Sequence, residues 1–338
     1  MKTKSNWLLV FLLMLLVGSP ISWSQEAIVI SIVNDDFDRE SELDWFQDKV
    51  KSEISNLLRN RVAFEFREQY GDYDPQKIQN AYDQAFADPD VDIVIGLGAF
   101  GCGILAQRPQ YAKPSIAAIV LDEDLQKVPY TPEGTSGVTN FTYIQSPFSI
   151  KRDLQMLHRM RPYQKLGVIG GNDLVSSFPF IKDLIDDIVD SLNVTAQLFP
   201  YPGSVDQLLS NIPAEVDAVY VFPLFDEVSP QGLETLFQGL HEKELASMAM
   251  LGENYIDKGA LMGYEADDNL QRLPRRIALN VLKIVEGAPA ADLPISIPTF
   301  NENLLINMAA ARASGVYPDF DLMSEAILTN LNEFKTDR

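Results

Sequence analysis

The sequence predicts an α/β protein made of two doubly wound lobes, with a chain that crosses between the lobes more than once. Strand-like apolar runs alternate with amphipathic, helix-like segments, and this alternation starts again after residue 140. The C-terminal part contains too few strand-like segments for a third sheet. A length of 338 residues agrees with two domains at roughly 100–200 residues each.

We divide the chain into a signal peptide (residues 1–25), a first lobe (26–140), a second lobe (141–260) and segments that return to complete both lobes (261–338). In the signal peptide, Lys2 and Lys4 precede an apolar run at residues 7–17, which is shorter than the roughly 20 residues of a membrane-spanning helix. No cysteine near the cleavage site could carry a lipid. We therefore expect a periplasmic or secreted protein that is neither a lipoprotein nor directly anchored in a membrane.

The first lobe is expected to begin with a buried strand at residues 27–33. Apolar side chains at spacings of three and four between Leu43 and Leu57 then predict an amphipathic helix. Pro75 marks the first turn of a second helix, and Pro109 follows a third, short one. Further strands are expected at residues 62–68, 91–98 and 115–121. Strands that alternate with helices in this way predict a parallel sheet covered on both faces.

The second lobe repeats this order, beginning with a strand at residues 165–171 that enters a tight turn. Apolar side chains between Phe180 and Leu192 predict a helix, and further strands are expected at residues 194–200 and 216–223. The segments at residues 91–98 and 216–223 look like equivalent strands of two similar halves. A long helix is expected from Asp267 to about Glu286.

The stretch "VDIVIGLGAFGCG" runs from a strand into G-x-G-x-x-G, formed by Gly96, Gly98 and Gly101. A dinucleotide-binding turn has this pattern, and Asp122, at the end of the next strand, stands where a ribose-binding acid would lie. However, the turn follows the third expected strand and not the first, and its helix is short. Nucleotide binding is therefore the least favoured of three interpretations.

The other two interpretations need no nucleotide. The glycines can simply permit a tight strand-to-helix turn. Alternatively, free backbone N–H groups at Ala99, Phe100 and Gly101 can bind a small anion such as a carboxylate, and we favour this use. Cys102, at the start of the same helix, is either a buried small residue, which we favour, or a thiol activated by the helix dipole.

From Val91 onward the order of segments resembles the ABC transporter substrate-binding proteins, whose members include binders of aromatic and other apolar amino acids. The stretches that carry the resemblance are "VDIVIGLGAFGCGILAQ", "KPSIAAIVLDEDL", "SGVTNF", "KLGVIGGNDLVSS", "VDAVYVFPLFDEV" and "NENLLINMAAARASGVYPDF". The resemblance implies two doubly wound Rossmann-like lobes with multiple crossovers, as in type I periplasmic binding proteins. It also implies a small-molecule ligand and an ABC permease of the inner membrane as partner.

In such a fold the ligand lies between the lobes, against the loops that follow successive strands. The candidate ligand-binding residues are Asn34, Asp35, Ala99, Phe100, Gly101, Asp122, Asn140, Asn172, Asp173, Phe225, Asp226, Glu253, Asn254 and Tyr264. They combine acids, amides and aromatic rings. An amino-acid-like ligand would need an acid for its ammonium group, N–H donors for its carboxylate, and an aromatic wall such as Phe100 or Phe225.

Composition disfavours several other classes of function. The net charge of -21 opposes binding to nucleic acid and to anionic lipid. With two histidines, no Cys/His cluster of metal-ligand spacing and no G-x-S-x-G motif, we expect no metal, no cofactor and no catalysis. The predicted function is a periplasmic solute-binding protein of an ABC-type transporter. The alternatives are a sensory or efflux-accessory protein without an import role, and an exported nucleotide-dependent oxidoreductase.

Overall fold

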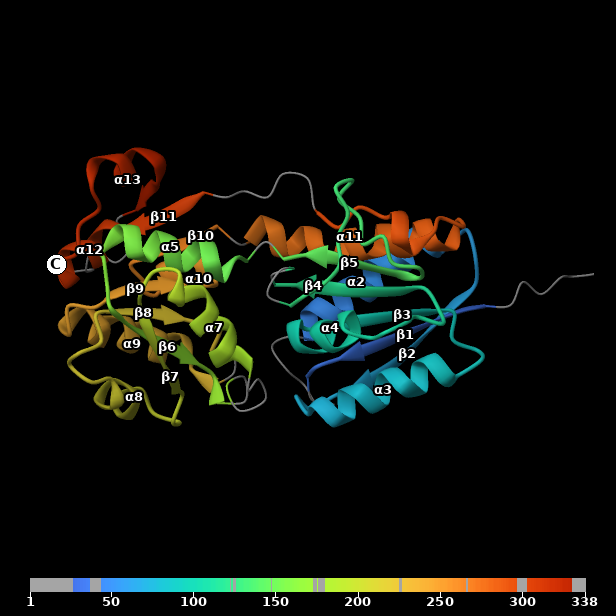
Figure 1. Cartoon of the computed structure of the whole chain (residues 1–338), viewed down its shortest axis with the longest axis horizontal. Coiled ribbons are helices and arrows are strands. Elements are labelled where there is room, and N and C mark those ends of the chain that lie inside the picture. The colour runs from blue at the N-terminus through green and yellow to red at the C-terminus, as the bar shows by residue number, and fades with distance from the viewer. Residues whose placement is uncertain are drawn as a thin grey trace, which may run out of the picture.

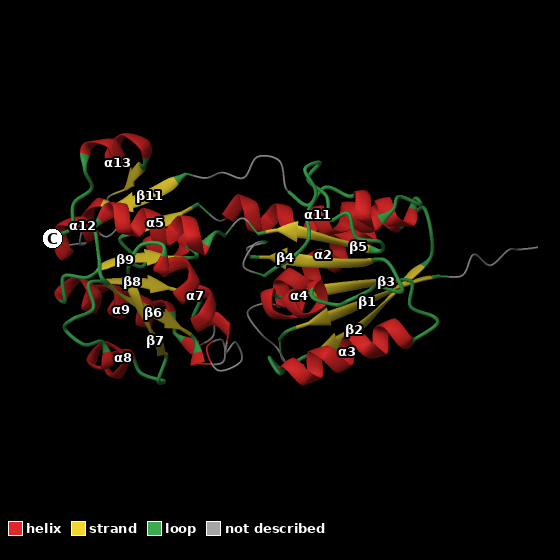
Figure 2. Cartoon of the chain, viewed as in Figure 1, coloured by secondary structure: helices red, strands yellow, loops and turns green. Residues whose placement is uncertain are grey.

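The structure is a computed structural model that describes residues 27–36, 44–121, 123, 126–146, 148–172, 175, 180–224, 227–265, 267–296 and 303–329. These residues form two α/β lobes that lie side by side, each around its own sheet (Figures 1 and 2). The predicted fold class is therefore confirmed. The predicted signal peptide lies outside the described residues, and within those residues no helix has the length and apolar character needed to cross a bilayer.

The first sheet is parallel throughout, in the order β2-β1-β3-β4-β5. Its strands are β1 (Ile28–Asn34), β2 (Phe64–Tyr70), β3 (Ile93–Leu97), β4 (Ser115–Val120) and β5 (Phe141–Gln145). All five residues of β3 are buried, as expected for a central strand with helices on both faces. At the edge of the sheet, β2 has no fully buried residue, which explains why its sequence is mixed and not continuously apolar.

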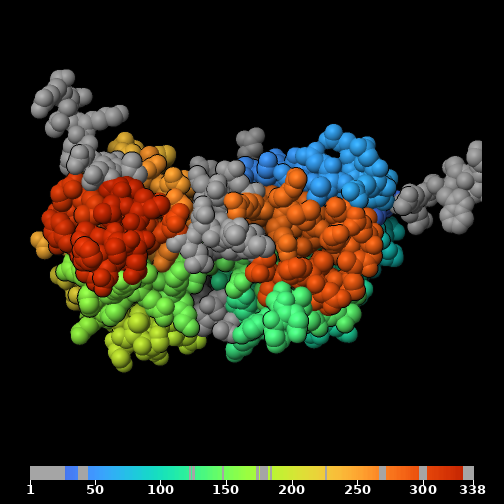
Figure 3. All heavy atoms as spheres, turned by 90° about the horizontal axis from the view of Figure 1, so that it is seen from above, coloured from blue at the N-terminus to red at the C-terminus, as the bar shows by residue number. Residues whose placement is uncertain are grey.

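Among the described residues, four helices cover this sheet. The chain runs from β1 to β2 in one direction along the sheet, and then from β2 to β3 and β4 in the opposite direction. Since such connections are right-handed, α2 (Asp44–Leu58) lies on one face, and α3 (Pro75–Ala87) and α4 (Ala99–Ala106) lie on the other. The returning helix α11 (Asp267–Val285) packs along α2, and Figure 3 shows its orange surface beside the blue one of α2. Pro75 begins α3 as predicted, and the Asp74 side chain caps it.

The second sheet has the order β12-β11-β10-β9-β8-β6-β7. Its strands are β6 (Lys165–Gly170), β7 (Thr195–Pro200), β8 (Ala218–Val221), β9 (Ala246–Ala249), β10 (Met262–Tyr264), β11 (Leu304–Asn307) and β12 (Ile327–Thr329). β11 is antiparallel to β10, whereas the other described neighbours are parallel. β8 pairs with β6 as β3 pairs with β1, so the two segments predicted to be equivalent occupy the same place in their sheets.

Helices also cover both faces of the second sheet. They are α5 (Ile150–Met160), α7 (Phe180–Asp190), α8 (Val205–Asn211), α9 (Pro230–Glu242), α10 (Gly252–Ile256), α12 (Met308–Ser314) and α13 (Phe320–Glu325). In β8, Ala218 and Tyr220 join one hydrophobic cluster, while Val219 and Val221 join another. The strand is therefore buried on both sides, which is why its sequence is apolar without alternation.

The chain crosses between the lobes three times: from β5 to α5, from β10 to α11, and from the short 3₁₀ helix η2 (Ala290–Asp292) to β11. Hydrogen bonds hold these crossings together at both ends. On the first lobe the Gln145 N–H donates to the Ile295 carbonyl at 2.8 Å, and on the second the Glu265 N–H donates to the Asn303 carbonyl at 3.0 Å. The three connections thus lie close to one another, an arrangement that allows the lobes to move as units about a hinge.

Candidate functional site

The strands of the two lobes point toward one another, so that the carboxyl ends of the parallel strands form two facing edges (Figures 1 and 2). In the first sheet the strand order reverses between β1 and β3, and in the second between β6 and β8. Ligands of doubly wound sheets bind outside the carboxyl ends of the strands at such switch points. The facing edges are therefore the candidate site.

Most of the sequence-predicted site residues that the structure describes lie at these edges. On the first lobe they end β1 or begin α4, and on the second they follow β6, begin α10 or end β10. They are Asn34, Asp35, Ala99, Phe100, Gly101, Asn172, Glu253, Asn254 and Tyr264. Four further candidates, Asp122, Asp173, Phe225 and Asp226, lie outside the described residues.

Asn140 lies at the opposite end of the first sheet. It precedes β5, and its carbonyl accepts a hydrogen bond at 2.8 Å from the N–H of Ser115, the first residue of β4. Its backbone is left-handed, with φ of 59°, and its side chain donates to the Tyr111 carbonyl. The expectation that Asn140 follows a strand is therefore wrong, because the strand in this region begins after it. Asparagine is common in turns on both sides of a strand, so the sequence did not show that Asn140 comes before β5.

The start of α4 already has a carboxyl partner within the chain. The N–H groups of Phe100 and Gly101 donate to the two carboxyl oxygens of Asp35, at 2.8 and 2.6 Å. Asp35 comes from the end of β1 and crosses the switch point to reach them. The expectation of free N–H groups is therefore wrong for these two residues, whereas a role in ligand binding stays a prediction.

The three glycines of the turn make room for two side chains of the chain itself. A Cβ atom on Gly98 or Gly101 would come within 2.3 or 2.2 Å of an Asp35 carboxyl oxygen, and one on Gly96 within 2.3 Å of the Tyr82 hydroxyl. Gly98 also has φ of 88°, which side-chain-bearing residues rarely adopt. The hydroxyl of Tyr82 donates to the Gly101 carbonyl at 2.9 Å. The G-x-G-x-x-G pattern is thus explained by packing around Asp35 and Tyr82, without a nucleotide.

Burial governs the acid–base properties of this region. It raises the pKa of Asp35 to about 7, against the opposing effect of the Gly101 and Phe100 hydrogen bonds and with a smaller contribution from the charge of Asp36. Burial and the charge of Asp35 also raise the pKa of the Cys102 thiol well above its usual range. Cys102 is fully buried and donates to the Gly96 carbonyl. It is therefore a packed thiol, as favoured from the sequence, and not an activated one.

Asn34 belongs to a polar network beneath the same edge. Its side-chain N–H donates to Gln47 at 2.8 Å, and Gln47 in turn donates to Glu68 and to the Tyr70 hydroxyl, at 2.6 and 2.9 Å. Lys51 completes the network with an ion pair to Glu68 at 2.6 Å. Asn34 is thus held by neighbours on α2 and β2, which fixes the end of β1 and the position of Asp35 after it.

The second lobe has a similar contact at its own switch point. The N–H of Asn172, which follows β6, donates to a carboxyl oxygen of Glu227 at 2.9 Å. A Cβ atom on Gly171 would come within 2.1 Å of the other carboxyl oxygen. Glu227 follows β8 and was not predicted as a site residue. Its position directly after Phe225 and Asp226, both of them candidates, was the signal that could have identified it.

Arg152 is a second residue that sequence reasoning missed. Its guanidinium lies 3.6 Å from the centre of the Tyr264 ring and 3.3 Å from a carboxyl oxygen of Asp153. Asp153 is buried and accepts a hydrogen bond at 2.8 Å from the Tyr220 hydroxyl. Burial raises the pKa of Asp153 to about 6, although Arg152 and Tyr220 oppose the shift. Arg152 and Tyr264 thus brace the second lobe where two of the crossings meet it.

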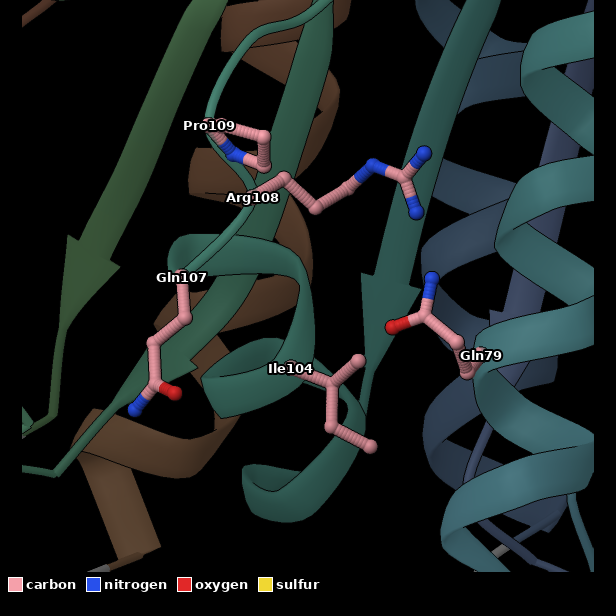
Figure 4. A pocket seen from close by; sticks show the side chains of 5 residues that line it. All are labelled: Gln79, Ile104, Gln107, Arg108 and Pro109. Atoms are coloured by element: carbon pink, nitrogen blue, oxygen red, sulfur yellow. The ribbon is translucent and has the colours of Figure 1, made fainter.

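A surface pocket of about 360 Å³ lies elsewhere, between α3 and α4 of the first lobe (Figure 4). It is lined by Gln79, Ile104, Gln107, Arg108 and Pro109. The guanidinium of Arg108 lies 4.5 Å from the centre of the Phe86 ring and 2.8 Å from a carboxyl oxygen of Asp83. All of these residues belong to one lobe, so this pocket is separate from the facing edges.

Comparison with known proteins agrees with the fold. No model of a protein family matches the chain, and no curated protein does. A solved structure of an ABC domain in complex with L-Trp from Streptococcus pneumonia is 17% identical, with a TM-score of 0.58, over 88% of this chain and 99% of that one. A conserved domain protein from Vibrio cholerae is 15% identical, with a TM-score of 0.60, over 90% of this chain and 99% of that one.

A carbohydrate transporter solute binding protein from Agrobacterium radiobacter, in complex with D-arabinose, is 12% identical. Its TM-score is 0.50, over 87% of this chain and 99% of that one. At these identities the likeness shows the fold, which is the pair of Rossmann-like lobes of type I periplasmic binding proteins. L-Trp and D-arabinose are ligands of those proteins, so the matched fold accommodates solutes of different chemistry.

Proposed function

We propose that this protein binds a small solute between its two lobes and closes on it by a hinge motion. The observation that carries the proposal is the pair of facing sheet edges, each with a switch point, joined by three adjacent crossings. The proposal has three further parts. The solute is an amino acid or a similar molecule, the protein delivers it to an ABC permease of the inner membrane, and the protein is periplasmic or secreted. The solute leaves unchanged, so no catalytic residue is assigned.

The residues that face the site suit recognition of a polar solute with an apolar part. Glu253 and Asn254 are exposed at the start of α10, directly after β9, and Tyr264 ends the adjacent β10. Gly252 allows these two segments to approach closely, because a Cβ atom at this position would come within 1.5 Å of the Tyr264 carbonyl oxygen. The second lobe therefore offers a carboxylate, an amide and an aromatic ring from neighbouring strand ends.

Native mass spectrometry of freshly purified protein tests the proposal directly. A retained mass of amino-acid size is the expected result, whereas a dinucleotide mass would support the oxidoreductase alternative. Thermal unfolding with a panel of amino acids and sugars then tests solute class, since a ligand at 100 times its Kd adds about 2.7 kcal/mol to stability. No retained mass together with no shift for any panel member would contradict solute binding.

A pair of asparagine variants places the binding on the facing edges. Asn254→Ala should weaken binding of whichever panel member shifts the unfolding temperature. Asn56→Ala is the matched control, because Asn56 is also exposed on a helix but lies on α2 of the other lobe. Equal affinities for the two variants would place the solute elsewhere. Small-angle scattering should show a smaller radius of gyration with solute, as expected for closure.

A further inference from the structure

We infer that Asp35 makes the first lobe selective for neutral or cationic parts of a solute, because its carboxyl group already occupies the position where an anionic group would bind. The inference rests on the proposed function and specifies the chemistry of its site. It reverses the sequence-based expectation that a solute carboxylate binds at the start of α4.

The donors in question are those that a helix N-terminus offers to an anion. Phe100 and Gly101 donate both of their N–H groups to Asp35, at 2.8 and 2.6 Å, so a solute carboxylate would have to displace the side chain. The exclusion is first a matter of occupied space and used donors. It therefore holds whether Asp35 carries a charge or a proton, and ionisation adds repulsion of a second anion.

Asp35 is fixed in this position from several sides. Its own N–H donates to the Leu97 carbonyl at 3.3 Å, and its carbonyl accepts from the Tyr73 N–H at 2.7 Å. The residue is only 3% exposed, and Gly98 and Gly101 enclose its carboxyl group without space for a Cβ atom. A side chain held in this way cannot turn aside to admit a solute anion.

The second lobe adds to the same selectivity. Glu227 accepts from the Asn172 N–H at the equivalent switch point, so an anion that approached this amide would also meet a carboxylate of the chain. The guanidinium of Arg152 on the same lobe is already engaged with the Tyr264 ring and with Asp153. An anionic group of a solute therefore finds that amides at both switch points already donate to a carboxyl group of the chain, whereas a neutral or cationic group does not compete for these donors.

Formate is the probe that tests the inference, because it is a carboxylate with no other functional group. Asp35→Ala should free the two N–H groups, and 50–100 mM sodium formate should then raise its unfolding temperature by several degrees above that in sodium chloride of equal ionic strength. Wild type and Asp35→Asn, in which a side chain of the same size fills the space, should show no such difference. If Asp35→Ala does not fold in chloride, recovery of its circular dichroism in formate gives the same answer.

Two results would overturn the inference: an equal formate effect on wild type and Asp35→Ala, or no formate effect on Asp35→Ala. The solute retained in native mass spectrometry provides a separate reading. A neutral or cationic solute supports the inference, whereas a dicarboxylate or other anionic solute contradicts it and leaves the proposed function intact. A protein that retains and binds no solute would contradict the proposed function, while the formate result would still decide whether Asp35 fills an anion position.

Discussion

The two switch points carry similar contacts at different depths. In the first lobe the acid comes from the end of β1 and caps the segment after β3, where Asp35 is 3% exposed and accepts two hydrogen bonds. In the second lobe the acid comes from the segment after β8 and reaches the amide after β6, where Glu227 is partly exposed and accepts one. Burial makes the first carboxylate a fixed part of the fold, while partial exposure leaves the second able to move.

The largest expected effect comes from filling the space beside Asp35. Gly98→Ala should lower the free energy of unfolding by about 3 kcal/mol or more, because the backbone region of Gly98 is nearly exclusive to glycine and the new methyl group meets a buried carboxyl group. Gly203→Ala is the matched control, since Gly203 has a similar φ of 86° with no atom within 4 Å of an added Cβ. It should lose only about 1 kcal/mol.

Urea unfolding of both variants measures the difference between them. Equal losses would mean that backbone conformation alone requires glycine at position 98, and the close approach of Asp35 would then have no energetic role. A larger loss of stability for Gly98→Ala than for Gly203→Ala would locate the difference in the contact with Asp35.

The pH dependence of stability tests the burial of Asp35 in the first lobe. The folded-state pKa of Asp35 is about 7, above its ordinary value of 3.8, so folding favours the protonated form. This contribution is complete below about pH 4 and is lost as the pH rises through 7. Between pH 5 and pH 8, wild type should therefore lose about 2–3 kcal/mol more than Asp35→Ala.

Urea titrations at half-unit pH steps provide this test. Asp153, whose pKa is raised to about 6, contributes with the same sign in both proteins and cancels in the comparison. If wild type and Asp35→Ala have parallel pH profiles, Asp35 is ionised in the folded protein well below pH 7, and the contrast between the two lobes is smaller than its burial implies.

Much of the fold could be predicted from the sequence, for reasons that the strands make plain. β1, β3 and β8 are buried on both faces, so their predominantly apolar runs were visible without any structure. The edge where candidate residues gather also followed from the order of strands and helices, since loops after parallel strands share one edge. Asn140 was misplaced because asparagine is common in left-handed turns both before and after strands, so its identity does not tell at which end of a strand it lies.

The contacts within the site could not be predicted in the same way. Asp35 and Gly101 are 66 residues apart, and only the pairing of β1 with β3 brings them together. The glycine pattern records that something lies close to the backbone, but a nucleotide, a solute anion and an internal carboxylate all require the same spacing. Nor did the sequence show that Tyr82, on α3, supplies the hydroxyl that requires Gly96 to lack a side chain.

A double-mutant cycle tests the contact between Gly96 and Tyr82, and its expected effect on stability is smaller than those at Gly98 and Asp35. Gly96→Ala should destabilise the protein because its Cβ would come within 2.3 Å of the Tyr82 hydroxyl, and Tyr82→Phe removes that oxygen. The combined variant should therefore recover about 1 kcal/mol relative to the sum of the single changes. Tyr111→Phe serves as control, because the Tyr111 hydroxyl bonds the far end of α4 and should show additivity with Gly96→Ala. Additivity in both pairs would contradict the packing explanation for Gly96.

The smallest effect is expected at Gly171, and this result completes the comparison of the lobes. An added Cβ would lie 2.1 Å from a Glu227 oxygen, nominally as close as the contact at Gly98. However, the obstacle is the end of a partly exposed side chain that can turn into solvent, and Gly171 has no left-handed φ. Gly171→Ala should therefore cost about 0.5 kcal/mol, and Glu227→Ala should cost no more because water can replace its single bond to the exposed Asn172. A loss at Gly171 comparable with that at Gly98 would show that Glu227 is as fixed as Asp35, and the two lobes would then be equally rigid toward a solute.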